Sequence, residues 1–289
     1  MLRPEAIVPL SHKLILAHVC AVIGAAFSLT VLIPYPLLWS HLPGAIENFK
    51  LAMIYAGPLH ILLGAAAMVA VGRKAIGTEA TLKFLVTAVV VSSSFELLGT
   101  GTGWPFGAYH YTSGLGFKLH DQVPFSIPFS WFYASFSGWL LAQATLARVG
   151  VPSGGFRGVL LGVWLLTAWD LVLDPAMSHP DLTMRFWIWD KPGQYLGMPL
   201  INLAGWMACG LLIITIGRAW GGGDVDPERI PAREAFAVYG INLLFGAIIC
   251  AVNGFWMPIL LSTLVGALPA AIGLFGERSE TAASSSPVG

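Results

Sequence analysis

The sequence predicts an all-α integral membrane protein, a bundle of about eight membrane-spanning helices, with seven as the alternative count. Of its 289 residues, 56% are hydrophobic and only 10% are charged. A soluble domain carries about 25% charged residues, so this chain lacks the polar surface of a water-soluble protein. Its net charge of zero gives no sign of a nucleic-acid partner. We therefore expect the lipid bilayer, and no nucleic acid, as its partner.

Eight apolar segments are long enough to cross the roughly 30 Å of hydrocarbon, which takes about 20 helical residues. They cover residues 14–33, 51–71, 82–98, 129–147, 156–173, 199–216, 235–252 and 255–275. Little more than Asn253 and Gly254 separates the last two, which form either a tight hairpin or one disrupted region. We expect one transmembrane domain over residues 1–277 and a disordered Ser/Ala-rich tail over residues 278–289.

The distribution of Lys and Arg predicts the orientation of the bundle. With eight helices and the N-terminus inside, eleven of these residues fall on the inner side and four on the outer side. The N-terminus is therefore predicted to be cytoplasmic. Two long loops, residues 99–128 and 174–198, then lie together on the opposite face. Loops of this length are usually functional or disordered, and their Gly-rich, aromatic composition is not typical of disorder.

Two acidic residues near the end of the fifth apolar segment are the strongest functional signal. Asp170 and Asp174 lie four residues apart, so they share one helical face. A carboxylate within a membrane helix is costly and by default marks a functional site. Trp169 and Trp187 lie nearby in the sequence. Acid groups beside aromatic rings in a membrane indicate proton chemistry on an apolar substrate.

A third acidic residue, Glu96, ends the third apolar segment and precedes a Gly-rich, aromatic loop. It is either a buried structural carboxylate or a catalytic acid. Trp104, Tyr109, Tyr111 and Trp131 form either an aromatic belt at the membrane interface or the walls of a binding site. The loop has neither the GK[ST] of a phosphate-binding loop nor a strand before its glycines.

Four further residues are candidates for the site. Asp174 precedes Pro175, so it either takes part in the chemistry or marks the helix end. Asp121 is a candidate for positioning water. His60 lies within an apolar segment, where a satisfied core histidine is the stronger reading. Asn202 enters the sixth segment and can hydrogen-bond across the bundle.

The sequence contains no motif that indicates a metal site. The seven histidines form no HxxxH or ExxH pair of the kind that helical metal sites use. The histidine boxes of membrane di-iron hydroxylases are missing too, which argues against oxygen-dependent chemistry. We expect no metal and no other cofactor.

Two other functions remain as alternatives. A magnesium-dependent prenyltransferase needs two aspartate clusters that face one cavity. Here Asp170 and Asp174 are predicted on the opposite face from Asp224 and Asp226, whose acidic run reads as a solvated connector. A proton-coupled transporter uses its acids as a relay. It more often has inverted repeats, and none is evident here.

Four motifs resemble the membrane carotenoid hydratases of the CruF type, which include gamma-carotene 1'-hydroxylase and bisanhydrobacterioruberin hydratase. They are E-x-x-G-x-x-T-G-x-P-F-G-x-Y-x-Y from Glu96 to Tyr111, V-P-x-x-I-P-x-x-W from Val123 to Trp131, A-W-D-L-x-x-D-P-x-M from Ala168 to Met177, and W-x-W-x-x-x-G-x-Y-x-G-x-P-x-x-N-x-x-G-W from Trp187 to Trp206. The resemblance covers the middle of the chain, and the flanking segments are similar only in being apolar.

The resemblance implies an enzyme of carotenoid biosynthesis that adds water across the terminal 1,2 double bond of an acyclic or monocyclic carotenoid. The substrate would be lycopene-like or gamma-carotene-like, and the product a tertiary alcohol. No metal or redox cofactor is implied. We expect such a protein in a bacterial or archaeal cytoplasmic membrane.

The candidate residues fit this chemistry. An alkene needs a strong proton donor, and an apolar setting keeps a carboxyl group protonated by disfavouring its charged form. Aromatic faces stabilise the resulting tertiary cation, and a second carboxylate takes a proton from water. We expect Asp170 or Glu96 as the acid and Asp174 or Asp121 at the water. The candidate substrate-binding residues are His60, Trp104, Tyr109, Tyr111, Trp131, Trp169, Trp187 and Asn202.

Overall fold

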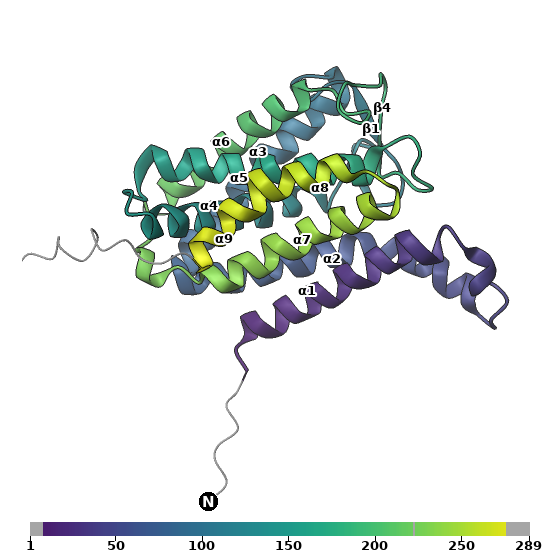
Figure 1. Ribbon diagram of the computed structural model, residues 1–289, viewed down its shortest axis with the longest axis horizontal. Coiled ribbons are helices and arrows are strands. Elements are labelled where there is room, and N and C mark those ends of the chain that lie inside the picture. The colour runs from purple at the N-terminus through teal and green to yellow at the C-terminus, as the bar shows by residue number, and fades with distance from the viewer. Residues whose placement is uncertain (1–7, 222, 276–289) are drawn as a thin grey trace, which may run out of the picture.

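The structure, a computed structural model, describes residues 8–221 and 223–275, and most of them form a bundle of helices (Figure 1). The helices are α1 (Leu10–Phe27), α2 (Ala45–Ala75), α3 (Thr78–Thr102), α4 (Ile127–Arg148), α5 (Gly155–Ser178), α6 (Ile201–Trp220), α7 (Ala232–Val252), α8 (Trp256–Ser262) and α9 (Leu268–Phe275). A π-helical turn extends α1 over Ser28–Leu32, and another over Thr263–Ala267 joins α8 to α9. The predicted disordered tail, residues 278–289, lies outside the described residues.

All eight predicted apolar segments are helical, which confirms the all-α class. Within the described chain, seven helices are long and apolar enough to cross a membrane. They are Leu10–Leu32, Ala45–Ala75, Thr78–Thr102, Gly155–Ser178, Ile201–Trp220, Ala232–Val252 and Trp256–Phe275. The last two form a tight hairpin, because α7 ends at Val252 and Gly254 turns the chain with a φ of 78°.

The eighth long helix, α4, lies at the centre of the bundle. Of its 22 residues, 17 are buried, and it packs against α2, α3, α5, α7 and α9. It is less apolar than the others because it contains several Ser, Trp and Tyr residues. Its serines hydrogen-bond within the helix, as when the Ser135 hydroxyl donates to the Trp131 carbonyl at 2.6 Å. A helix buried on all sides does not need the continuous lipid-facing surface of its neighbours.

The two long loops contain four short strands, which the sequence analysis did not predict. β1 (Tyr109–Tyr111) pairs antiparallel with β4 (Trp187–Trp189), so a segment after α3 lies beside a segment after α5. β2 (Lys118–Leu119) pairs with β3 (Val123–Pro124) to form a small hairpin. Each strand has two or three residues, which is too short for a detectable alternating pattern.

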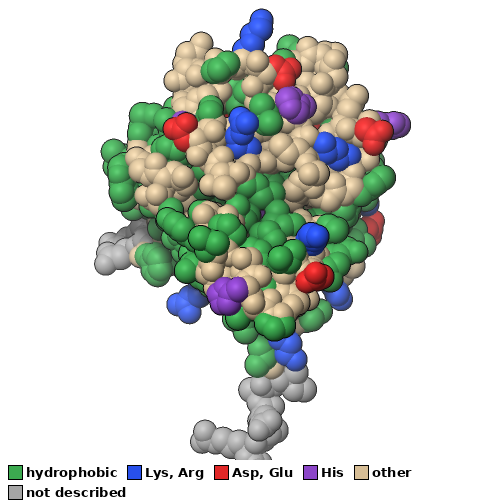
Figure 2. All heavy atoms as spheres, turned by 90° about the vertical axis from the view of Figure 1, so that its right-hand side faces the viewer, with side chains coloured by type: hydrophobic (Ala, Val, Ile, Leu, Met, Phe, Trp, Pro, Cys, Tyr) green, Lys and Arg blue, Asp and Glu red, His purple; other side chains and the backbone are tan. Residues whose placement is uncertain are grey.

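The two long loops lie at the same end of the bundle, as predicted, where Figure 1 shows β1 and β4 side by side. The connection between α1 and α2 extends past the other helices at this end (Figure 1). Figure 2 looks onto the same end. Hydrophobic side chains gather across its middle, and Lys, Arg, Asp, Glu and His side chains stand around them.

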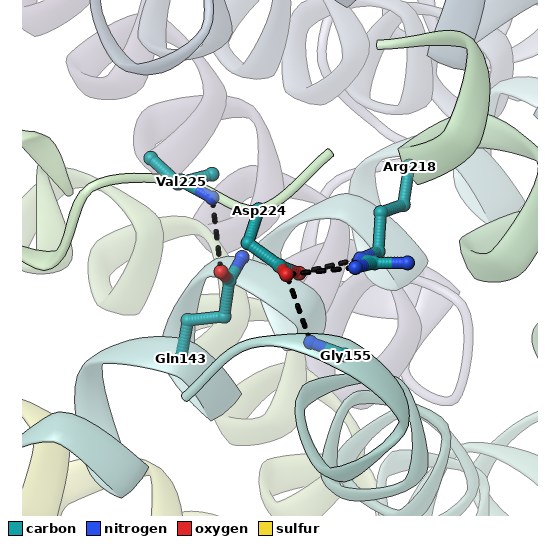
Figure 3. Close-up of polar contacts among 5 residues, drawn as sticks. All are labelled: Gln143, Gly155, Arg218, Asp224 and Val225. Atoms are coloured by element: carbon teal, nitrogen blue, oxygen red, sulfur yellow. Dashed lines mark hydrogen bonds and ion pairs between the residues drawn. The ribbon is translucent and has the colours of Figure 1, made fainter. Parts of the chain in front are cut away.

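At the opposite end, Asp224, Asp226 and Glu228 of the acidic run are exposed, as the reading of a solvated connector expects. Figure 3 shows the contacts of Asp224. Asp224 accepts two hydrogen bonds from Arg218, at 2.5 and 2.7 Å, and one from the Gly155 N–H at 2.8 Å. The neighbouring Val225 N–H donates to Oε1 of Gln143 on α4 at 3.0 Å. The guanidinium of Arg218 lowers the pKa of Asp224 below its usual range. The α6–α7 loop is therefore tied to α4 and α5.

Candidate active site

Glu96 lies near the end of α3, where it is buried and surrounded by neutral hydrogen-bond donors. Its Oε2 accepts from the hydroxyl groups of Tyr109 and Tyr111, the latter at 2.9 Å. Its Oε1 accepts from the indole N–H of Trp131 on α4 at 2.8 Å. Three donors from two separate segments therefore converge on one carboxyl group. This favours the carboxylate form without supplying a compensating charge.

The local sequence explains how both tyrosines reach Glu96. Alternate residues of a strand point to the same side, so Tyr109 and Tyr111 point inward while His110 between them is exposed. Gly99, one turn beyond Glu96, leaves room for the loop to fold back, because a Cβ there would lie 2.7 Å from the ring of Phe106. Burial and the charge of Glu96 hold the pKa of both tyrosines well above its usual range, so both remain donors.

Asp174 is the second carboxyl group of the site. Its Oδ1 accepts from the Ser178 hydroxyl at 2.6 Å and from the Trp189 indole at 3.0 Å, and its Oδ2 from the Trp187 indole at 3.2 Å. The two tryptophans are two residues apart on β4, so their side chains lie on the same side of the strand. Pro175 does not end the helix, because α5 continues to Ser178. The reading of Asp174 as a helix terminator is therefore wrong.

Asp170 lies one turn before Asp174 and is completely buried. The side-chain N–H of Asn202 on α6 donates to its Oδ2 at 2.8 Å and lies 3.5 Å from Oδ2 of Asp174. The other oxygen of Asp170, Oδ1, has no hydrogen-bond partner. Asn202 thus connects the two aspartates, and it leaves Asp170 with fewer donors than Asp174.

Glu96 and Asp174 face a common cavity, which we call the acidic pocket. It encloses about 440 Å³ of empty space, counted up to its open mouth. The other polar or aromatic residues that line it are Phe106, Tyr109, Tyr111, Ser130, Trp131, Trp187, Trp189, Asn202 and Trp206. Trp206, which was not among the predicted site residues, packs against Trp131 with ring centres 4.2 Å apart and the ring planes tilted by 30°. Its place at the end of the W-x-W…G-W motif was the signal for it.

A second and larger cavity adjoins the first, and we call it the apolar pocket. It contains about 830 Å³ of empty space, including its open mouth. Residues of α1, α2, α4, α5, α7 and both long loops line it. The predicted site residues His60 and Trp169 lie here rather than in the acidic pocket. Nδ1 of His60 donates to the Ala56 carbonyl at 3.3 Å, and its ring lies beside that of Phe245.

Two predicted site residues lie apart from both cavities. Asp121 is exposed at the turn between β2 and β3, where it and His120 have φ values of 58° and 49°. Asp121 is therefore part of the tight turn of this hairpin. Trp104 is 61% exposed at the loop end of the bundle. For Trp104 the interface-anchor reading fits its position better than the binding-wall reading.

Comparison with known proteins identifies the family. The profile of the family described as "Carotenoid biosynthesis protein" matches residues 56–269. The chain is 31% identical over 192 residues to the bisanhydrobacterioruberin hydratase of Haloarcula japonica, a match that covers 63% of this chain and 60% of that relative. No solved structure matches the chain.

The chain spans less than two thirds of the relative's length, so the hydratase name describes that relative. The family match is broader, because residues 56–269 include every residue that lines the acidic pocket. They also include Asp170 behind that pocket. The chain therefore belongs to the family of carotenoid biosynthesis proteins.

Proposed function

We propose that this protein is a carotenoid hydratase, which adds water across the terminal 1,2 double bond of an acyclic carotenoid end to give a tertiary alcohol. Three observations support the proposal: the family of the chain, the name of its halobacterial relative, and the buried carboxyl groups at the loop end. The third observation concerns chemistry directly and carries most of the weight.

Glu96, Asp170 and Asp174 are buried without a cationic partner. None of the ion pairs among the described residues involves any of the three. An ionised carboxylate that is buried and unpaired is very costly, and it avoids this cost by taking up a proton. Several such groups in one site cannot all be ionised. At least one of them therefore holds a proton at neutral pH, which is what protonation of an alkene requires.

The geometry favours the pair Asp170 and Asp174 as the holder of that proton. Their Oδ2 atoms share one amide nitrogen of Asn202, and two neighbouring carboxyl groups with no cation between them share a proton. Asp174 lines the acidic pocket, whereas Asp170 lies behind it. We therefore infer that Asp174 contacts the substrate, and that Asp170 exchanges the proton with Asp174 from behind the pocket. This revises the sequence-based preference for Asp170 or Glu96 as the acid.

The reaction then has two steps. In the first, the alkene π electrons form a C–H bond at the less substituted carbon with the proton of Asp174, which leaves a carboxylate and a tertiary cation. In the second, the oxygen of a water molecule bonds to the cation, and one proton of that water passes to Glu96. Return of this proton from Glu96 to the aspartate pair, across the same pocket, completes the cycle. The net change is addition of one water molecule.

The remaining walls of the pocket suit the cation. Trp131 and Trp206 pack against each other beside Glu96, and Trp187 and Trp189 lie beside Asp174. An aromatic face attracts a cation through its ring quadrupole, by roughly 2 kcal/mol or more when water is excluded. Since the three donors Tyr109, Tyr111 and Trp131 favour the carboxylate form of Glu96 and Asp170 has only one donor, Glu96 suits the role of proton acceptor better than that of donor.

The alternatives fit these positions less well. Asp224 lies beside Gly155 at the beginning of α5, whereas Asp170 and Asp174 lie near its end. Because Asp224 is also engaged with Arg218, it cannot form one magnesium site with them. A transporter remains compatible with buried acids, but the aromatic lining of a half-open pocket favours an apolar reactant over a small ion.

The test is expression in cells that make lycopene, grown in water labelled with oxygen-18, followed by mass spectrometry of the pigments. We expect a hydrated carotenoid that contains the heavy oxygen. Oxygen from labelled O2 instead of water would exclude this mechanism. Failure to form any hydrated pigment from lycopene or gamma-carotene, with the protein present in the membrane, would exclude the function.

A further inference from the structure

The acidic pocket and the apolar pocket adjoin, because four residues line both of them. Ile127, Ser130, Leu173 and Trp187 border both cavities, and we call this set the junction. The first two come from the beginning of α4, Leu173 from α5, and Trp187 from β4. A ligand that extends from one cavity to the other must therefore pass between these four side chains.

We propose that the apolar pocket holds the polyene chain of the substrate and that Ser130 and Leu173, at the junction, determine which end groups reach the carboxyl groups. This inference rests on the proposed hydration, and it adds a binding site for the chain and a basis for end-group selection. The acidic pocket alone has about half the empty space of its neighbour, 440 against 830 Å³. The longer, unreactive part of a carotenoid belongs in the larger cavity.

The side-chain amide of Asn242, a polar group of the apolar pocket, is already engaged in hydrogen bonds within the protein. Asn242 donates to the His18 ring at 2.9 Å and to the Val238 carbonyl at 2.8 Å, and it accepts from the Tyr133 hydroxyl at 3.3 Å. The other lining residues are mostly aliphatic, aromatic or glycine. A cavity with such a lining suits a long apolar ligand without charged groups.

The position of the apolar pocket gives such a ligand a route from the membrane. Its lining includes the loop-side parts of α1 and α2, such as Leu29 and Ala56, together with Leu115 and Phe186 of the two long loops. These elements meet at the end of the bundle where hydrophobic side chains gather across the middle (Figure 2). Ala56 is exposed, so the cavity is reached from the surface of α2.

The walls of the junction are held in place, which makes it selective. The Ser130 hydroxyl donates back to the Ile127 carbonyl at 2.7 Å, so this small side chain stays against its own helix. The indole of Trp187 is fixed by its hydrogen bond to Asp174. Leu173 directly precedes Asp174 on α5. Because packed walls do not yield freely, a slender acyclic end can pass between them, whereas a six-membered ring is obstructed.

The first test measures binding without catalysis. The purified Asp174→Asn protein is heated in micelles with and without lycopene, since a ligand that binds only the folded state raises its melting temperature. We expect lycopene to raise the melting temperature of Asp174→Asn. Adding Ala56→Trp, which fills the apolar pocket, should abolish this rise. Adding Tyr55→Trp on the adjacent exposed face of α2 should preserve it. An equal rise with both tryptophans, or no rise at all, would overturn the pocket assignment.

The second test addresses the junction with beta-carotene, which has a ring at both ends. We expect beta-carotene to raise the melting temperature of the Asp174→Asn protein much less than lycopene does. The additional change Leu173→Ala should remove this difference, whereas Leu160→Ala on the exposed face of α5 should not. Equal stabilisation by both carotenoids before the junction is widened would overturn the selective role of Leu173.

A third measurement separates failure of this inference from failure of the proposed function. In the active protein, Ser130→Leu should reduce lycopene hydration by roughly tenfold or more, a scale typical of a misfit in an apolar pocket. Stabilisation by lycopene without any hydrated product would reject the function and leave the pocket assignment standing. Full hydration by Ser130→Leu and Ala56→Trp would reject the pocket assignment and leave the function standing.

Discussion

The side-chain amide of Asn202 donates to Oδ2 of Asp170 at 2.8 Å, and both side chains are buried. The same nitrogen lies 3.5 Å from Asp174, one turn further along α5. A neutral amide can hold two carboxyl groups together without cancelling their charge. In the proposed mechanism this pair holds the proton, which a lysine or arginine in the same place would displace.

Replacement of Asn202 by Leu is expected to lower hydrated product by roughly 10²-fold, the scale of losing one preorganised donor. The physical reason is that Asp170 loses its one hydrogen bond and the pair loses its fixed geometry. The yield of pigment is measured in lycopene-producing cells, normalised to protein in the membrane. Asn253→Leu, at the end of α7, is the control and should retain activity. A fully active Asn202→Leu variant would show that the amide does not position the acids.

The variants Asp170→Asn and Asp174→Asn are each expected to lower hydration by about 10²- to 10⁴-fold, the range of general acid catalysis. Asparagine keeps the size of the side chain but cannot supply the proton. Asp190→Asn is the matched control, because Asp190 is exposed and pairs with His110 at 2.9 Å. Normal product from both variants, with loss only in Glu96→Gln, would transfer the role of acid to Glu96.

Trp206→Leu should reduce hydration by about tenfold, while Trp206→Phe should retain most of the activity. Only the phenylalanine keeps an aromatic face for the cation, and such a contact contributes roughly 1–2 kcal/mol when partly desolvated. The rates of product formation are compared at equal protein level. Trp220→Leu serves as control, since Trp220 is exposed at the other end of α6. Equal losses in the Leu and Phe variants would indicate packing rather than charge stabilisation.

Asp224→Asn should lower thermal stability at pH 7 by about 1–2 kcal/mol, since the hydrogen bonds involve charged groups but remain partly exposed. The pKa of Asp224 is lowered in the folded protein. Its contribution is therefore present above the unfolded pKa of about 3.9 and is lost as pH falls below that value. The difference in melting temperature between variant and wild type should shrink between pH 5 and pH 3. Asp181→Asn, at an exposed loop position, is the control variant.

The two ends of the bundle are expected to lie on opposite sides of the membrane, with the acidic pocket away from the cytoplasm. In a Cys20→Ser background, Asp121→Cys marks the loop end and Asp226→Cys the other end. An impermeant maleimide added to spheroplasts should label the first and spare the second until the membrane is opened. Labelling in the reverse order would place the acidic pocket on the cytoplasmic side.

Some predictions from the sequence failed for identifiable reasons. Asp121 was grouped with the acids because it lies in the same loop, yet a tight turn between β2 and β3 places it at the surface. Asp174 was given a structural alternative because proline often ends a helix, but α5 continues past Pro175.

The sequence by itself determined the membrane bundle, because apolar runs of about 20 residues form helices wherever they lie in lipid. It also singled out Glu96, Asp170 and Asp174, since a carboxyl group in such a run is conspicuous. Only the tertiary structure decided which of them face one cavity. Pairing of β1 with β4 brings Tyr111 opposite Trp187, and thereby joins the loop that serves Glu96 to the loop that serves Asp174. Contacts between segments so far apart depend on the packing of the whole bundle, which no local pattern records.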